Sequence, residues 1–504
     1  MTSKETVAAT KPQWLSEAET ATKIKKGKPV ENIRVDALPP VLLDGWRVDR
    51  DCLDLIIAAL QRSTPEQVHP FILELRRARA DRAFDEFAWE LLEQWIDAGA
   101  APKQKWVILC VTMLGSEMLL FRLIPFVRKW RVQSFFDRAK FGLECLNASG
   151  EKVALSEISE MSYLMSLRSL QNRAREIMER VAKERGITVG ELEDRIVPDC
   201  GLRGGSGERT FDFGTRSFRL IIHNLRPGVM DEDGNKFAML PAPEASDDAR
   251  LAEIAMMDWL LVSEILQSIV DAQTLRLEHA MINNRRWTRA EFDEHLMSHP
   301  MMTHLIKLLV WGAYDADGKL LGTFRIADDN TFADERDAAT RLAGCTAVGI
   351  IHPFCLPADI RGQWGEIFSD YEIEQLFPQL GRQLFGLDSG EGAQTTMRRG
   401  FSRKVSATRF EKNIVALNWV LGTGGPLHSP FARYFSGFDL TAVTDEVPAK
   451  SKADLETKRI LFFLKGMRKV DLHFETERLA LQLIPPQVIS EALLDLTTAS
   501  LSAS

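Results

Sequence analysis

Apolar runs separated by turn residues dominate the second half of the chain. The run at residues 305–311 is followed by Asp315-Ala316-Asp317-Gly318 and by a second run at 320–326. Asp-Gly between apolar runs indicates a tight hairpin, because glycine accepts the positive φ that such turns need. A third run, 346–351, stops at Pro353, where proline cannot donate to a ladder. The pattern predicts three strands of one mixed sheet, around which the back half is organised.

In the front half, from Arg50 to about residue 195, apolar positions recur at helical spacing. Leu53, Ile56, Ile57 and Leu60, for example, fall on one helix face. A longer helical run spans about residues 156–186. Short amphipathic helices joined by brief polar turns predict antiparallel pairs stacked like a short HEAT-type solenoid, although no exact motif repeats.

Strand patterns return after residue 198 and alternate with helical ones. Residues 209–214 and 217–222 predict a hairpin, about 248–283 a long helix, 459–463 a strand, and Pro485-Pro486 the start of a last helix. The predicted class is therefore α+β, with a HEAT-like helical front and a mixed-sheet back. The predicted limits are 1–45 for a flexible leader, 50–195 for the helical repeats, 196–497 for the α+β domain and 498–504 for a disordered tail.

Composition and charge narrow the function classes. A net charge of −8 and a pI near 5.8 argue against a nucleic-acid or membrane binder that uses its whole surface. The apolar stretch 106–127 contains Gly115, Arg122 and Pro125, so two packed helices explain it better than a membrane span. The polar first 15 residues do not resemble a signal peptide, and the six cysteines form no C-x-x-C pair. Reduced thiols in a cytoplasmic protein are expected.

Several motifs in fixed order resemble the bacterial domain-of-unknown-function family 4132, a WGR-linked family that includes proteins named molybdate-metabolism regulators. The resemblance covers about residues 65–497, and Leu376 and Gln383 stand where that family often has proline. It implies a helical-repeat front, an α+β back, no established reaction, and partners of the MoxR-type ATPase and von Willebrand A-type classes. A WGR module itself is not visible. The motifs are RIVPDCGL at 195–202, FDFG at 211–214, RRWT at 285–288, LVWG at 309–312, VGIIHP at 348–353 and FPQLGR at 377–382.

Polar residues that gather around the three predicted strands are the candidate site. They allow a cleft in which Glu366 or Asp370 is the acid or base and His352 is a proton shuttle. Arginines would hold an anion there. They equally allow a buried ion-pair network that fixes helices onto the sheet, which is the preferred interpretation. The candidate binding residues are Arg285, Arg286, Arg325, Trp364, Tyr371 and Arg382.

Metal and cofactor sites are not expected. His295 and His299 have the i, i+4 spacing of a shared metal site, but Pro300 takes His299 out of helical geometry. Residues 422–425, Gly-Thr-Gly-Gly, lack the Gly-Lys-Ser/Thr of a phosphate loop and fit a turn between strands.

Three functions remain open at this point. The preferred hypothesis is a non-catalytic interaction module that recruits proteins into an ATPase-associated complex. The alternative is an enzyme that acts on an anionic, nucleotide-like substrate in the arginine- and carboxylate-lined cleft. A third hypothesis is nucleic-acid binding through the lysines between Lys23 and Lys28.

Overall fold

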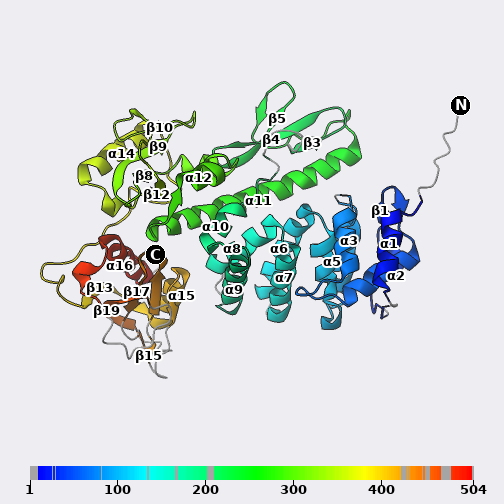
Figure 1. Cartoon of the computed structure of the whole chain (residues 1–504), viewed down its shortest axis with the longest axis horizontal. Helices are drawn as coiled ribbons and strands as arrows, with labels where there is room; N and C mark the ends of the chain where they lie inside the picture. The colour runs from blue at the N-terminus through cyan, green and yellow to red at the C-terminus, as the bar shows by residue number, and fades with distance from the viewer. Residues whose placement is uncertain are drawn as a thin grey trace. The chain divides into compact units, whose positions relative to one another are not determined.

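The structure is a computed structural model of the chain, and its residues divide into two compact units (Figure 1). The first unit comprises residues 1–198 and 250–265, and the second comprises 199–249 and 266–504. Helix α11, Ala249–Ile282, confirms the predicted long helix and supplies residues to both units. The residues described are 10–24, 27–28, 30–80, 82–132, 135–164, 168–200, 202, 209–421, 428–429, 431–444, 447–448, 454–466 and 478–501.

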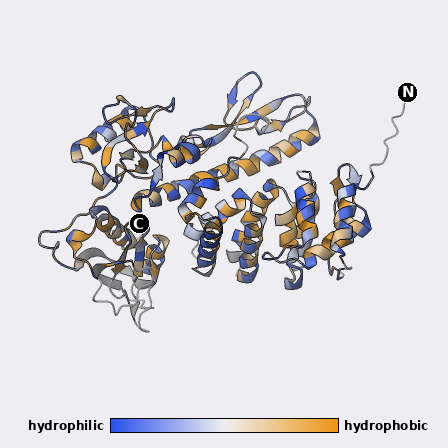
Figure 2. Cartoon of the chain, in the orientation of Figure 1, coloured by the Kyte–Doolittle hydropathy of each residue, from blue (hydrophilic) through white to orange (hydrophobic). Residues whose placement is uncertain are grey.

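Helices two apart in sequence contact one another in the first unit. Helix α5 contacts α3 and α7, α7 also contacts α9, and α8 contacts α6 and α10. Trp89 of α4 stacks edge-on against Phe126 of α6, with ring centroids 5.3 Å apart. Hydrophobic and hydrophilic residues alternate along these helices (Figure 2). This two-layer pattern is that of stacked helix pairs, so the predicted helical front is confirmed. The helices are α2 Arg50–Gln61, α3 Pro70–Ala78, α4 Asp85–Asp97, α5 Trp106–Leu114, α6 Glu117–Val132, α7 Phe136–Ser149, α8 Lys152–Leu164, α9 Arg168–Glu184 and α10 Val189–Arg195.

Two stretches of the front half, one apolar and one with a helical pattern, each form a pair of helices. The stretch at 106–127 contains α5 and the start of α6, and α6 begins just after Ser116, whose backbone N–H donates to Asp85 Oδ1 at 2.7 Å. None of the described helices is long and apolar enough to cross a bilayer. The stretch at 156–186 was predicted as one helix. It is instead divided between α8 and α9, which pack against each other, and residues 165–167 between them lie outside the described residues.

Part of the predicted flexible leader is folded. Helix α1, Gln13–Thr22, packs against α3 and buries Leu15 completely, and β1, Leu42–Leu43, pairs with β2, Trp46–Arg47. A single buried leucine is too weak a signal to show periodicity, which is why the sequence pattern missed this helix. Residues 1–9, like 502–504 of the predicted tail, lie outside the described residues.

Among the described residues of the second unit, three sheets have four or more strands. The strand orders are β3-β4-β5-β6, β11-β10-β9-β8-β12-β7 and β13-β19-β17-β16-β14. Each of the pairings within them is antiparallel, so the α+β class is confirmed but the expected mixed sheet is an antiparallel one. Short hairpin connections favour antiparallel pairing, because joining two parallel strands needs a long crossover segment. The strands are β3 Thr210–Asp212, β4 Ser217–His223, β5 Arg226–Asp231, β6 Lys236–Phe237, β7 Arg286–Thr288, β8 Trp311–Tyr314, β9 Leu320–Ile326, β10 Phe332–Ala333, β11 Ala339–Thr340, β12 Ala347–Ile350, β13 Thr396–Ser406, β14 Val420–Leu421, β16 Phe431–Phe435, β17 Leu440–Thr444 and β19 Asp454–Lys465, with β15 His428–Ser429 and β18 Val447–Pro448 as a separate pair.

The Asp-Gly hairpin lies at the centre of the six-stranded sheet, as predicted. Strand β8 pairs with β9 on one side and with β12 on the other, and Gly318 in the turn has φ +79°. The predicted strand at 305–311 is wrong except at its last residue, because α13, Met302–Ile306, extends into it, residues 307–310 form a turn and β8 begins only at Trp311. The buried side chains Met302, Leu305, Ile306 and Leu309 follow the i, i+3, i+4, i+7 spacing of a helix.

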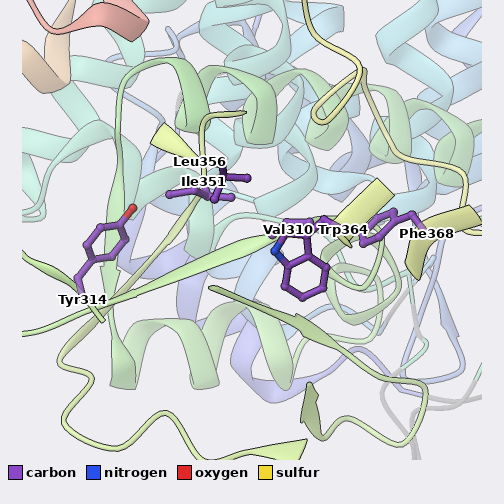
Figure 3. Close-up of a cluster of buried hydrophobic side chains, with 6 residues drawn as sticks. All are labelled: Val310, Tyr314, Ile351, Leu356, Trp364 and Phe368. Carbon is purple, nitrogen blue, oxygen red and sulfur yellow. The ribbon is translucent and has the colours of Figure 1, made fainter. Parts of the chain in front are cut away.

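The two faces of this sheet carry different side chains. Trp287, Trp311 and Phe324 share one face, where Phe292 packs against Trp311 with centroids 5.1 Å apart. The opposite face holds Tyr314 and is covered by α14, Ala358–Asp370. The buried cluster on this face has Tyr314 at one end and Trp364 with Phe368 at the other (Figure 3), and its other members are Val310, Ile351 and Leu356.

Candidate functional site

The predicted site residues separate into three groups, each tied into the fold by a different partner. Arg325, Trp364 and Tyr371 meet between β9 and α14. Arg285 and Arg286 lie at β7, over aromatic rings of that strand and of β8. His352 and Arg382 converge on a carboxylate of α16, Pro486–Ala499.

In the first group, Arg325 is buried and its Nη2 donates to Asp337 Oδ1 at 2.7 Å. The Tyr371 hydroxyl donates to Asp337 Oδ2 at 2.6 Å, and its ring lies 4.4 Å from the Arg325 guanidinium carbon. These hydrogen bonds, that of Tyr371 first, lower the pKa of the Asp337 carboxyl, and the same carboxylate raises the pKa of Tyr371. Beneath them, Trp364 Nε1 donates to Thr323 Oγ1 at 3.0 Å. These contacts join strand β9 and the loop that contains Asp337 to helix α14 and the residue that follows it.

In the second group, the guanidinium carbon of Arg286 lies over the ring of Tyr314, 3.6 Å from its centroid. Arg286 Nη1 also donates to the carbonyl oxygen of Gly318 at 2.9 Å and so fastens the hairpin turn. Arg285 lies 4.7 Å from the centroid of the Trp287 ring. Both arginines therefore contact aromatic side chains of the six-stranded sheet.

Two glycines make room for the Tyr314 ring. A Cβ atom at Gly312 would lie 2.9 Å from Tyr314 Oη, and a Cβ at Gly349, on the neighbouring strand, would lie 3.0 Å from the carbonyl oxygen of Arg285 and 3.5 Å from the ring. Burial raises the pKa of Tyr314 to about 12, against the opposing charge of Arg286. At neutral pH the phenol is therefore a neutral packing group.

The third group is a buried ion-pair network around Glu491 of α16. Arg382 donates to both Glu491 oxygens, from Nε at 2.5 Å and from Nη2 at 2.6 Å, and its Nη1 donates to Glu278 at 2.6 Å. Burial by itself would raise the pKa of Glu491. The hydrogen bonds and charges of Arg382 and His352 outweigh it and hold that pKa at about 2. Glu491 is therefore an ionised, fully enclosed anchor.

His352 uses both ring nitrogens inside the fold. Nδ1 accepts from the backbone N–H of Phe354 at 3.1 Å, which leaves the Nε2 proton to donate to Glu491 at 3.0 Å. Glu366 and Asp370, by contrast, are exposed on α14. Because one candidate is enclosed and the other two face solvent, the three side chains do not form a shared acid–base set. The geometry is that of the structural network rather than that of the cleft.

A second buried carboxylate lies one turn further along α16. Asp495 Oδ2 accepts from Trp419 Nε1 at 2.7 Å and from Nη1 of Arg433 on β16. Burial raises the pKa of Asp495 despite the charge of Arg433. Glu491 and Asp495 thus tie one helix to the end of the six-stranded sheet and to the five-stranded sheet. Neither carboxylate was predicted, because nothing in the local sequence marks a carboxylate whose partners are far away in the chain.

Of the histidines considered for a metal, His299 has another role. His299 is buried, and its Nδ1 accepts from the backbone N–H groups of Met301 and Met302, at 3.2 and 3.3 Å. Across the described ranges, no three His, Cys, Asp or Glu side chains converge as metal ligands do. Residues 422–425 lie outside those ranges.

An open groove of about 730 Å³ lies in the first unit and was not predicted. The connection between α4 and α5, the first turns of α7 and part of α9 line it. Phe135 and Phe136 at its rim are 46% and 44% exposed, and Lys105 and Lys140 are also exposed. Arg138 lies among aromatic side chains that include Trp95. The only sequence signal for it is the exposed Phe-Phe pair before a basic helix turn.

Comparison with known proteins adds a family and a distant relative. Residues 234–419 match the family described as Domain of unknown function (DUF4132), a shorter range than the motifs suggested. The protein named Uncharacterized protein YehI, from Escherichia coli (strain K12), is 29% identical over 364 residues, which are 72% of this chain and 30% of that protein. The chain thus spans less than a third of this relative's length, and no solved structure matches it. The resemblance drawn from the motifs is confirmed over residues 234–419, which match the model of that family.

Proposed function

We propose that the chain is a non-catalytic interaction module that recruits partner proteins into a multiprotein assembly. The observation that carries this proposal is the groove of the first unit, with two exposed phenylalanines and three cations outside the described ion pairs, Lys105, Arg138 and Lys140, around it. Aromatic and arginine side chains are the residues that dominate binding energy at protein interfaces. Stacked helix pairs also present extended surfaces suited to binding other chains.

The ion pairs of one predicted catalytic side chain, His352, and of two predicted binding side chains, Arg325 and Arg382, support the same proposal. Arg325, Arg382 and His352 are paired with Asp337 or Glu491, so an anionic substrate would have to displace carboxylates that these groups already hold. An enzyme with an anionic or nucleotide-like substrate is therefore the less favoured function.

Nucleic-acid binding through the basic segment is less favoured as well. The Lys28 backbone N–H donates to Gln61 Oε1 at 2.8 Å, and its carbonyl oxygen accepts from Gln61 Nε2 at 2.9 Å, so this end of the segment is docked on α2. Lys25 and Lys26 lie outside the described residues.

The partners we propose are a MoxR-type ATPase and a von Willebrand A-type protein, the classes that the family resemblance implies. We place the assembly in the cytoplasm. The free thiols of Cys110 and Cys145 are fully buried, and burial raises the pKa of Cys110 to about 12, so this thiol stays protonated and packs as a small apolar group.

Quantitative affinity purification from native lysate tests the proposal. A chain tagged at its chromosomal locus and expressed at its natural level should co-purify an ATPase of this class in amounts comparable to the bait. The same tag on an unrelated acidic protein is the control. Recovery of the bait alone, before and after mild crosslinking, would overturn the interaction-module proposal.

A further inference from the structure

Arg138 differs from the other described arginines that lie on aromatic rings in the helical unit. Its guanidinium carbon is 4.5 Å from the centroid of the Phe135 ring, 5.2 Å from that of Trp95 and 5.7 Å from that of Trp130. Its hydrogen bond within the described part of the chain runs from Nη2 to the carbonyl oxygen of Ala100 at 3.3 Å, and no described carboxylate forms an ion pair with it. A guanidinium has five N–H donors, so most remain available.

Arg122 provides the contrast. It also lies on a tryptophan, 3.8 Å from the ring centroid of Trp89, but Glu93 is 3.7 Å from its Nη2. Burial lowers the pKa of Arg138 with no opposing anion, whereas at Arg122 the charge of Glu93 partly offsets the same effect. Arg138 is thus partly desolvated and lacks the carboxylate that would balance its charge.

Two more cations face the same groove. Lys105 Nζ lies 4.2 Å from the ring centroid of Phe141, and Lys140 is exposed on α7 two residues after Arg138. Neither makes an ion pair with a described carboxylate, while Arg173, which also lines the groove, is already paired with Glu144. The groove therefore has three cations that form no ion pair with a described carboxylate, beside apolar rings.

We propose that this groove binds a peptide segment of a partner protein in which an Asp or Glu stands next to an aromatic or aliphatic side chain. The peptide carboxylate pairs with Arg138 and is reinforced by Lys105 and Lys140, and its apolar neighbour packs on Phe135 and Phe136. A bidentate arginine–carboxylate pair is strong and directional, and aromatic rings supply apolar contact area with little loss of side-chain freedom. The inference rests on the proposed interaction function and names the ligand class of its groove.

The lining favours an acidic peptide over a nucleic acid. Two exposed carboxylates, Glu66 and Asp137, stand among the cations, and they would repel a chain that carries a phosphate at every nucleotide. A peptide with a single carboxylate can place it at Arg138 and avoid both. The net charge of −8 on the whole chain acts in the same direction.

Panning a phage-displayed library of random 12-residue peptides tests the inference on the full chain. The enriched peptides are then synthesised with fluorescein, and Kd is measured by anisotropy for the wild type, Arg138→Gln, Lys140→Gln and Arg122→Gln. We expect Asp or Glu beside an apolar residue in the enriched set. We also expect about ten-fold weaker binding to Arg138→Gln and a smaller loss for Lys140→Gln. Arg122→Gln, the matched control outside the groove, should bind as the wild type does.

Several outcomes would overturn the inference. They are enrichment of peptides without carboxylates, no enrichment over the Arg138→Gln chain, or unchanged Kd when the peptide Asp or Glu is replaced by Asn or Gln. A fluorescein-labelled sixteen-nucleotide dT strand that binds the wild type and loses affinity with Arg138→Gln would assign the groove to nucleic acid instead. Arg138 packs on buried tryptophans, so the thermal unfolding midpoints of the variants and the wild type are compared first. If Arg138→Gln is unstable, the Kd of Lys140→Gln, a substitution at an exposed position, decides the outcome.

Failure here is separable from failure of the interaction module. If the ATPase co-purifies equally with wild type, Arg138→Gln and Lys140→Gln, the module stands and the groove inference falls. If peptides bind as expected but no partner co-purifies, the groove assignment stands and the recruitment proposal falls.

Discussion

At the scale of single residues, Tyr314 shows how close packing restricts the centre of the six-stranded sheet. Its ring lies over Gly312 and Gly349 and under the guanidinium of Arg286. The ring needs positions without Cβ on its own strand and on the adjacent one, which is a reason for glycine that has nothing to do with positive φ. The glycines are plain in the sequence, but the neighbour that requires them is known only once β8 and β12 are paired.

Gly312→Ala should therefore destabilise the protein by about 1–3 kcal/mol, because the new methyl group overpacks the ring. Urea denaturation followed by tryptophan fluorescence measures this. Gly322→Ala, on the adjacent strand, is the matched control, because a Cβ there meets no atom within 4 Å. Equal stability of the two variants would refute the packing role of Gly312.

At the scale of secondary structure, α16 holds the second unit together through two carboxylates one turn apart. Proline at the start of the helix and its apolar positions were predictable from local sequence, and both are found. The partners were not, since Arg382 lies 109 residues and Arg433 62 residues from the carboxylate it binds. Similarly, the 305–309 segment was assigned to a strand because a short apolar run is compatible with either element.

The Glu491 network predicts acid sensitivity. The pKa of Glu491 is about 2 in the folded protein against an ordinary value of 4.5, so its contribution is present above pH 4.5 and is lost as the pH falls toward 2. The shift corresponds to roughly 3 kcal/mol of unfolding free energy. Asp495, whose pKa is raised, changes stability in the opposite sense over its own range. Comparing the pH dependence of stability in the wild type and in Glu491→Gln, which both contain Asp495, therefore isolates the effect of Glu491.

Urea denaturation between pH 5 and pH 2.5 measures this effect. The unfolding free energy of the wild type should fall more steeply with decreasing pH than that of Glu491→Gln, which should be less stable at pH 7. Glu366→Gln, at an exposed position of α14, should keep the wild-type slope. Parallel curves for the wild type and Glu491→Gln would mean that the network does not stabilise the fold.

At the scale of the whole molecule, α11 is one continuous helix whose first half belongs to the first unit and second half to the other. It buries Val262 and Leu266 on either side of the division, and Leu277 further on. The sequence shows the length of the helix, because its apolar positions continue without a cap or a proline. Its division between two cores is a property of the tertiary structure.

Glu264→Pro should disrupt both units, because proline removes a helix hydrogen bond and clashes with the preceding turn, at a cost of about 3 kcal/mol or more. Glu264 is exposed, so losing its side chain should change the stability little. Glu264→Ala is therefore the control. Hydrogen exchange followed by mass spectrometry should show lower protection in both 250–265 and 266–282. Loss confined to one of these segments would contradict the prediction.

The sequence by itself determined the class of the fold, the Asp-Gly hairpin, the long helix and the helical front, because periodicity, turn residues and caps act over a few neighbouring positions. It also contained the family motifs. Only the tertiary structure decided that Arg325, Arg382 and His352 are internal anchors and that Arg138 is left without a carboxylate. Whether a charge is compensated depends on residues brought together from distant parts of the chain, and local sequence carries no record of that pairing.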